Sequence, residues 1–275
     1  MLGYLRTKFK VLSAISQKKA ASEAFKLFCT PLNMTTKPSS FIFDTAEFLD
    51  LKLKNNVLRG YRWNYPSAKK ILIMHGFSSS SKNFHHFVTP LIQKGYEVLA
   101  FDAPAHGISE GATITALDYA NMIERIIELY GPVKNFIAHS LGGLAVCLAL
   151  EEIEHDEKTK LVLIAPATET TSAIDHAFEL LQIKNNGVRK EFNKIIYSIN
   201  EKPTEWYSVR RAVKKLKAKI IWIHDRDDRT TPFKDVENAM KEKFTNVQFE
   251  ITTGLGHSKI YRDPKVVSMV TDFFK

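Results

Sequence analysis

A serine among small residues lies between two apolar segments. We predict a buried strand over residues 133–138 and an apolar helix over residues 144–150, joined by Ala138-His139-Ser140-Leu141-Gly142. This small-x-Ser-x-Gly spacing between strand and helix is typical of a nucleophile elbow, in which the serine backbone is strained and its neighbours must be small. The elbow presents Ser140 at a helix N-terminus, where N–H groups stabilise a developing negative charge. Ser140 is therefore a predicted nucleophile, and Gly142 keeps the turn open.

The elements that would position this serine belong to one large domain. The chain has 275 residues, 44% of them hydrophobic, and no Gly/Ser/Pro-rich linker divides it. Two cysteines, Cys29 and Cys147, cannot form a disulfide framework, so we predict a reducing, cytoplasmic location. The formal charge is +9, but the basic residues carry no zinc-finger, RNA-recognition or Walker spacing, which argues against nucleic acid as a partner.

Predicted strands and helices alternate along most of the chain. The predicted strands are residues 47–54, 57–65, 71–74, 97–101, 133–138, 161–165, 220–224 and 247–251. The first two form an antiparallel hairpin at one sheet edge, and Thr115 and Asp118 form a capping box for a helix over residues 116–130. A last helix covers residues 264–274. The pattern predicts an α/β fold with a mostly parallel, doubly wound sheet of about eight strands.

Two helical regions do not fit this alternation. Residues 172–183, 188–199 and 204–216 predict three helices where a parallel crossover needs one, so we expect the excess to form a lid over the strand ends. Apolar residues in this lid could line an acyl pocket or pack within the lid: Phe178, Leu180, Leu181, Ile195, Ile196, Trp206 and Tyr207.

The second region is the N-terminal extension, predicted over residues 1–40. Apolar residues recur there at helical spacing, at Leu2, Leu5, Phe9, Leu12 and Ile15, and basic residues lie among them, at Arg6, Lys8, Lys10, Lys18 and Lys19. Lys8 and Lys10 interrupt any signal-peptide core. Such a helix could lie on an anionic membrane surface, but packing on the domain is the interpretation we favour. At most, a weak peripheral membrane contact is expected.

With these features in place, the sequence resembles the α/β-hydrolase superfamily, in its serine esterase- and lipase-like branch, over residues 45–275. Four motifs match in order: His75-Gly76-Phe77, the turn from Asp102 to Ser109, the serine elbow, and an acid followed by a histidine. The sequence departs from the family with Ala138 and Ala105, each in a place where glycine is usual. The resemblance implies an α/β-hydrolase domain over residues 41–275, with a helical lid inserted at about 167–218.

The resemblance also implies a Ser-His-Asp triad, in the chain order serine, acid, histidine. Residues 225–232 are similar to the family pattern Gly-x-x-Asp-x-x-x-Pro, which puts Asp228 in the acid place and Asp225 where glycine is usual. We favour Asp228 and expect Asp225 to cap the turn and Asp227 to be solvated. Gly254-Leu255-Gly256-His257 resembles the family's Gly-x-Gly-His loop, so His257 is the predicted base.

Further roles follow from the same resemblance. Backbone N–H groups of Phe77 and Leu141 would form the oxyanion hole, while His75 and Gly76 would brace the loop beside it. The histidines at 75, 85, 86, 106 and 139 have no partner ligands at zinc spacing, so no metal is predicted, and the implied chemistry needs no cofactor.

The sequence thus predicts hydrolysis of a carboxylic ester through an acyl-enzyme intermediate. The expected partner is a small-molecule ester with an apolar acyl group. Acyl transfer, thioester hydrolysis and amide or peptide hydrolysis on the same triad remain alternatives, as does a peripheral membrane lipid-binding protein.

Overall fold

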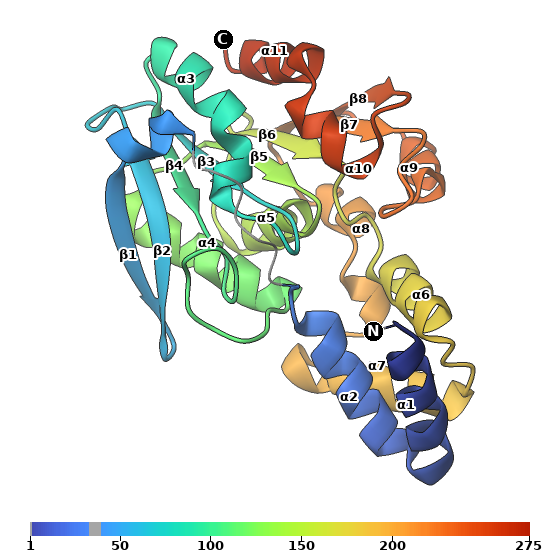
Figure 1. Ribbon diagram of the computed structural model, residues 1–275. Coiled ribbons are helices and arrows are strands. Elements are labelled where there is room, and N and C mark those ends of the chain that lie inside the picture. Colours follow the sequence, from blue (N-terminus) through green and yellow to red (C-terminus); the bar gives the residue numbers. More distant parts are fainter. Residues whose placement is uncertain (1, 33–39) are drawn as a thin grey trace.

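One eight-stranded sheet forms the centre of the computed structural model, which describes residues 2–32 and 40–275 (Figure 1). The strands are β1 (Glu47–Leu53), β2 (Asn56–Trp63), β3 (Lys70–Met74), β4 (Glu97–Phe101), β5 (Asn135–His139), β6 (Lys160–Ile164), β7 (Lys219–Asp225) and β8 (Val247–Thr252). Their order is β1-β2-β4-β3-β5-β6-β7-β8, and only the β1–β2 and β2–β4 pairs are antiparallel. The predicted mostly parallel sheet and its edge hairpin are confirmed.

Helices cover both faces of this sheet. The core on one face includes side chains of α3 (His85–Gln93) and α11 (Pro264–Phe273). The core on the other face includes side chains of α4 (Ala116–Tyr130), α5 (Leu141–Glu152) and α9 (Phe233–Met240). The predicted capping box at Thr115 and Asp118 is present at the start of α4. Because both faces are covered, the central strands are buried along most of their length.

Several short elements were not predicted. They are η1 (Phe41–Thr45), η2 (Ser81–Phe84), α10 (Gly256–Lys259) and η4 (Ile260–Arg262). The helix α9 between β7 and β8 was also missed.

A helical insertion, residues 167–218, lies between β6 and β7. It contains α6 (Thr170–Leu181), α7 (Asn186–Asn200), the turn η3 (Thr204–Trp206) and the short helix α8 (Val209–Val213). The predicted single helix over residues 204–216 is wrong. Ser208 is extended there, pairs with Glu169 across an isolated β-bridge, and caps α8 through its hydroxyl, so the helix can begin only at Val209.

The N-terminal hairpin, formed by α1 (Leu2–Ile15) and α2 (Gln17–Cys29), packs on this insertion (Figure 1). Phe25 and Phe28 of α2 meet Phe192 of α7 edge-on, with ring centroids 5.5 and 5.9 Å apart. Packing on the rest of the protein is thus observed for α1 and α2. Met1 and residues 33–39 of the predicted extension 1–40 lie outside the described residues.

The apolar side chains of the insertion mostly fill its interior. Phe178, Leu181, Ile196 and Tyr207 are buried, and the Phe178 ring meets Phe192 at 5.3 Å. Their burial favours packing within the insertion over a role in lining an acyl pocket. No helix in the described part of the chain combines the length and apolar character needed to cross a membrane.

Candidate active site

Ser140 occupies a strained turn between β5 and α5. Its backbone has φ 52° and ψ −121°, a conformation that L-residues rarely adopt. The helix after it begins close to β3, because a Cβ on Gly142 would lie only 2.6 Å from the His75 carbonyl oxygen. A Cβ on Gly76 would similarly lie 2.8 Å from the Ser140 Cβ. The two glycines therefore allow the backbone to pass directly beside the serine.

Two side chains from distant loops complete a hydrogen-bonded chain with this serine. His257 Nε2 lies 3.0 Å from Ser140 Oγ, and His257 Nδ1 lies 2.7 Å from Asp228 Oδ2. These residues come from the starts of α5 and α10 and from the turn after β7. The structure therefore brings together the three residues that the sequence predicted, in an arrangement that can move a proton from the hydroxyl to the imidazole.

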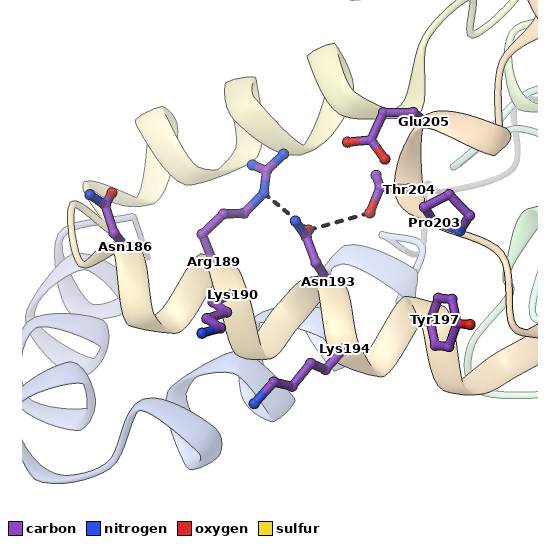
Figure 2. Close-up of a pocket in the computed structure, with 9 residues that line it drawn as sticks. All are labelled: Asn186, Arg189, Lys190, Asn193, Lys194, Tyr197, Pro203, Thr204 and Glu205. Atoms are coloured by element: carbon purple, nitrogen blue, oxygen red, sulfur yellow. Dashed lines mark hydrogen bonds between the residues drawn. The ribbon is translucent and has the colours of Figure 1, made fainter.

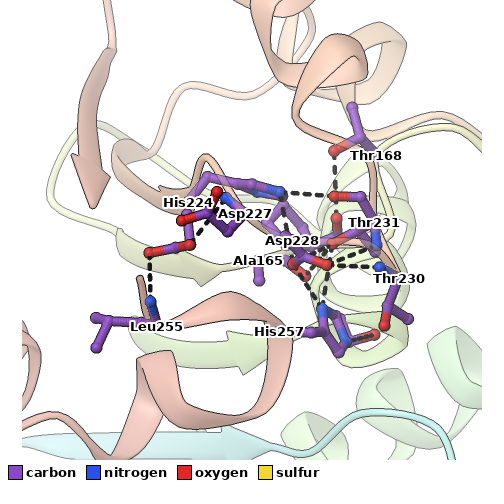
Figure 3. Close-up of polar contacts among 12 residues, drawn as sticks. Ala165, Thr168, His224, Asp227, Asp228, Thr230, Thr231, Leu255 and His257 are labelled. Atoms are coloured by element: carbon purple, nitrogen blue, oxygen red, sulfur yellow. Dashed lines mark hydrogen bonds and ion pairs between the residues drawn. The ribbon is translucent and has the colours of Figure 1, made fainter. Parts of the chain in front are cut away.

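Asp228 is held as a carboxylate by its own turn (Figure 3). Its Oδ1 accepts hydrogen bonds from the backbone N–H groups of Thr230 and Thr231, at 2.8 and 2.9 Å. The Thr231 hydroxyl donates to Oδ2 at 2.8 Å and lies 3.2 Å from His257 Nδ1. Burial acts to raise the pKa of Asp228, but His257 and the Thr231 donors outweigh it and lower that pKa to about 2. Sequence reasoning missed Thr231.

Asp225 has a different task from Asp228. It is fully buried, and its Oδ1 accepts from the Asp227 N–H, as a turn cap would. Its Oδ2 also accepts from the Thr252 hydroxyl at 2.7 Å and from the Leu255 N–H at 3.1 Å. Asp227 is exposed, but its Oδ2 accepts from the Gly254 N–H at 2.8 Å. Both carboxylates thus tie the acid turn to the loop before His257.

Two neutral histidines brace the loop that carries Phe77. His75 Nε2 accepts from the Ala103 N–H at 3.0 Å, and His106 Nε2 accepts from the Ser78 N–H at 2.9 Å. Burial is the main reason that the pKa values of both imidazoles fall to about 4, so each ring stays neutral and keeps its acceptor nitrogen. His75 was named from the sequence as a residue of this loop, whereas the contact of His106 with the loop was missed.

The backbone donors predicted for the oxyanion hole belong to residues next to the elbow: Leu141 follows Ser140 in the chain, and Phe77 follows Gly76, which packs against Ser140. Within residues 2–32 and 40–275, neither the Phe77 N–H nor the Leu141 N–H donates a hydrogen bond to another group of the protein. Leu141 is the first residue of α5, so its N–H belongs to the unpaired first turn of that helix.

The turn after β4 supports the same loop. Asp102 Oδ1 accepts from the Ser81 N–H at 2.7 Å, and its Oδ2 accepts from the Ile108 N–H at 3.1 Å. Gly107 has φ 53°, and a Cβ there would lie 2.0 Å from Asp102 Oδ2. Ala105, at φ 65°, adopts a left-handed conformation in the place where the family has glycine.

Two more buried histidines adjoin the site. His139 Nε2 donates to the His257 carbonyl oxygen at 3.0 Å, and His224 Nε2 donates to the Thr231 carbonyl oxygen at 2.9 Å. Burial lowers the pKa of both rings. Sequence reasoning gave these two histidines no role in the site. Their positions, directly before Ser140 and at the end of β7, could have indicated one. Among the described residues, no three His, Cys, Asp or Glu side chains form a set that could hold a metal ion.

A large surface groove lies elsewhere, on the helical insertion (Figure 2). It has a volume of about 590 Å³ and is lined by residues of α7 and η3, including Arg189, Asn193 and Thr204. Asn193 Oδ1 accepts from Arg189 Nε and from the Thr204 hydroxyl, at 3.2 and 3.3 Å. None of the Ser140, Asp228 and His257 side chains lines this groove, so its size gives no reason to move the candidate site.

Known proteins share both the sequence pattern and the fold. The sequence profile of the family described as serine aminopeptidase, S33, matches residues 65–225. A Mycoplasma pneumoniae protein whose name assigns it to the esterases and lipases is 21% identical over 227 residues, which are 71% of this chain and 84% of that protein.

Solved structures agree on the fold. An esterase from Pyrococcus furiosus superposes with a TM-score of 0.63 at 20% identity, covering 90% of this chain and 97% of the esterase. A bacterial membrane phospholipase A, described as a virulence factor, superposes with a TM-score of 0.62 at 16% identity, covering 83% and 86% of the two chains. The chain belongs to the serine aminopeptidase S33 family, and thus to the hydrolases of the α/β-hydrolase superfamily.

Proposed function

We propose that the protein hydrolyses a carboxylic ester through a Ser140–His257–Asp228 triad. The observation that carries this proposal is the continuous chain of short contacts, 3.0 Å from Ser140 Oγ to His257 Nε2 and 2.7 Å from His257 Nδ1 to Asp228 Oδ2. The strained backbone of Ser140 supports it, because such strain at a serine between a strand and a helix is a feature of nucleophile elbows.

The proposed reaction has two halves. His257 Nε2 takes the proton of Ser140 as its oxygen attacks the ester carbonyl, and the N–H groups of Phe77 and Leu141 stabilise the resulting oxyanion. The intermediate collapses, the alcohol leaves with the proton from His257, and the acyl group stays on Ser140. A water molecule, deprotonated by the same imidazole, then releases the carboxylic acid. Asp228 remains ionised throughout, since its lowered pKa of about 2 keeps it charged.

An ester fits the surroundings of Ser140 better than an aminopeptidase substrate. An aminopeptidase must hold the ammonium group of its substrate, and a carboxylate is the usual partner for such a charge. Four carboxylates of the surrounding loops already accept hydrogen bonds from N–H groups of the protein: Asp102, Asp225, Asp227 and Asp228. Phe77 is 36% exposed and offers apolar surface next to the proposed oxyanion hole, which suits an acyl chain.

A fluorophosphonate probe, mapped by peptide mass spectrometry, tests the nucleophile. We expect an adduct on Ser140 in the wild-type protein and none in Ser140→Ala or His257→Ala. Ser140→Ala should keep its circular dichroism spectrum and lose roughly 10⁶ in turnover, because triad members act as a unit. A folded Ser140→Ala protein that retains turnover within about tenfold would reject the serine mechanism.

Competing substrates test the ester assignment. We expect p-nitrophenyl esters to be cleaved with a higher kcat/KM than matched aminoacyl p-nitroanilides or acyl thioesters. Added alcohols should leave the yield of free acid unchanged. A higher kcat/KM on the anilides would replace the ester proposal with a peptidase, and transfer of the acyl group to the alcohol would replace it with an acyltransferase.

A further inference from the structure

The outer side of α1 carries an apolar surface that the packing of the N-terminal hairpin leaves uncovered. Tyr4, Val11 and Ile15 are 73%, 52% and 72% exposed. They are seven and four residues apart, so they lie along one side of the helix. Phe9, on the inner side, is 1% exposed. The sequence pattern grouped Ile15 with Phe9; the structure places the two side chains on different sides of the helix. We call Tyr4, Val11 and Ile15 the outer face of α1.

The helix that bears this outer face, and the helix after it, are rich in basic residues. Residues 2–32 contain six basic side chains, at 6, 8, 10, 18, 19 and 26, and one acidic side chain, Glu23. Their net charge is therefore +5, out of +9 for the whole chain. Lys8 is paired with Glu23 at 2.7 Å, while Lys10, Lys18 and Lys19 are exposed. More than half of the net positive charge is thus concentrated in about a tenth of the sequence, next to exposed apolar side chains.

We propose that the outer face of α1 docks on the surface of an anionic lipid bilayer. Exposed apolar side chains on a basic helix are the features that let a helix lie in the interfacial region of a membrane. Each Lys or Arg near such a surface contributes about 1 kcal/mol of attraction. A second copy of this chain is the less suitable occupant, because two surfaces of charge +5 would repel each other.

Several contacts join the N-terminal hairpin to the helical insertion, so a membrane bound by α1 would lie close to the insertion. Arg6 Nε donates to the Leu180 carbonyl oxygen of α6 at 3.0 Å, and Asn185 Nδ2, at the start of α7, donates to the Ser13 carbonyl oxygen at 3.4 Å. The Phe25 and Phe28 contacts with Phe192 join the same two parts. A bilayer held by α1 therefore lies beside the insertion rather than beside the distant sheet edge at β1 (Figure 1). This docking does not depend on the proposed ester chemistry.

Vesicle co-sedimentation tests the docking. The full chain is used as Ser140→Ala, so that hydrolysis cannot alter the lipids, with vesicles of phosphatidylcholine alone or mixed with phosphatidylserine. We expect binding only to the mixed vesicles, and loss of binding at high salt. Replacing Lys10, Lys18 and Lys19 by Gln should weaken it about a hundredfold, as three contributions of about 1 kcal/mol require. Val11→Ser with Ile15→Ser should also weaken it.

Matched variants elsewhere on the surface serve as controls. Replacing the exposed Lys202, Lys241 and Lys243 by Gln removes the same charge, and Leu129→Ser removes a side chain of α4 that is 47% exposed. Both should bind like the parent protein. Equal binding by all variants, binding to phosphatidylcholine alone, or no binding by a folded protein would overturn the proposal. So would a dimer that Ile15→Ser dissociates in the absence of vesicle binding, because the second copy would then be the occupant.

Discussion

The loops around Ser140 and the α6–α7 part of the helical insertion differ in how far their charged side chains are buried. In the loops, buried carboxylates accept several short hydrogen bonds each, as Asp228 does from Thr230, Thr231 and His257. Between α6 and α7 of the insertion, charged side chains instead pair at the surface, as Arg189 does with Asp175, whose side chain is 69% exposed. Buried charge networks fix atoms in one arrangement, whereas exposed pairs contribute little energy and tolerate change.

This difference suggests a division of work between the two regions. The loops hold the reacting groups at fixed distances, whereas the insertion packs against its N-terminal hairpin through aromatic side chains: Phe178, Phe25, Phe28 and Phe192. Substitutions in the loops should therefore reduce the rate for every substrate, while substitutions in the insertion should change stability first.

Among substitutions that leave Ser140 and His257 in place, the largest effect is expected for Asp228→Asn. Loss of the carboxylate removes the group that orients His257, so turnover should fall by roughly 10⁴. Asp225→Asn is the matched control, because Asp225 bonds to the Thr252 hydroxyl and the Leu255 N–H and makes no contact with the imidazole nitrogens. Asp225→Asn should lower the denaturation midpoint, and it should reduce kcat far less than Asp228→Asn does. The reverse ranking in steady-state kinetics would make Asp225 the acid.

Phe192→Ala tests whether the insertion is separable. Phe192 is 1% exposed, and its loss should cost about 3–5 kcal/mol of the packing between α7 and the N-terminal hairpin. We expect faster hydrogen exchange in α1, α2 and α7, with turnover of short soluble esters preserved within about tenfold. Phe41→Ala is the control: this side chain is 78% exposed, so its loss should change neither the hydrogen exchange of these helices nor the turnover of esters. A loss of turnover as large as that of Asp228→Asn would mean that the insertion is part of the reacting centre.

The pH dependence of stability probes the histidines of the loops. His75 and His106 have pKa values lowered to about 4 in the folded protein, so below an ordinary pKa of 6.5 the unfolded chain binds protons that the folded chain does not. Their contribution to stability is present above pH 6.5 and is lost as the pH falls towards 4, by roughly 3 kcal/mol for each ring. The free energy of unfolding, measured by urea denaturation at several pH values in this window, should depend less steeply on pH in His106→Gln than in the wild-type protein. The same pH dependence in both proteins would contradict the neutral, bracing role of His106.

Thr231→Val should have the smallest effect. The substitution removes the hydroxyl that donates to Asp228 Oδ2 but keeps the backbone N–H that donates to Oδ1. We expect kcat to fall about tenfold with little change in KM, since one hydrogen bond to a charged group is lost. Thr230→Val is the control, because Thr230 gives Asp228 only its N–H. Equal kcat values for the two variants would show that the Thr231 hydroxyl does not position the acid.

Much of the site was predictable because it depends on backbone geometry that few residues allow. Small residues around Ser140, and strands with continuous apolar runs, are local signals that survive in a single sequence. Thr231 and His106 were missed because no periodicity encodes their contacts. Thr231 bonds to Asp228 within one turn, and His106 bonds to Ser78, 28 residues away in another loop. The interruption of the predicted helix at Ser208 was missed for the same reason, since its β-bridge partner Glu169 lies in another segment.

The pairing of the N-terminal hairpin with α7 also sets the order of assembly during synthesis. Phe28 and its partner Phe192 are 164 residues apart in the sequence. At roughly 10 residues per second, α2 would emerge from the ribosome about 16 seconds before α7 exists. Through that interval its phenylalanines have no native partner, and the contact can close only after β3, β4, β5 and β6 have been made. Docking of the hairpin on α7 is therefore a late folding event.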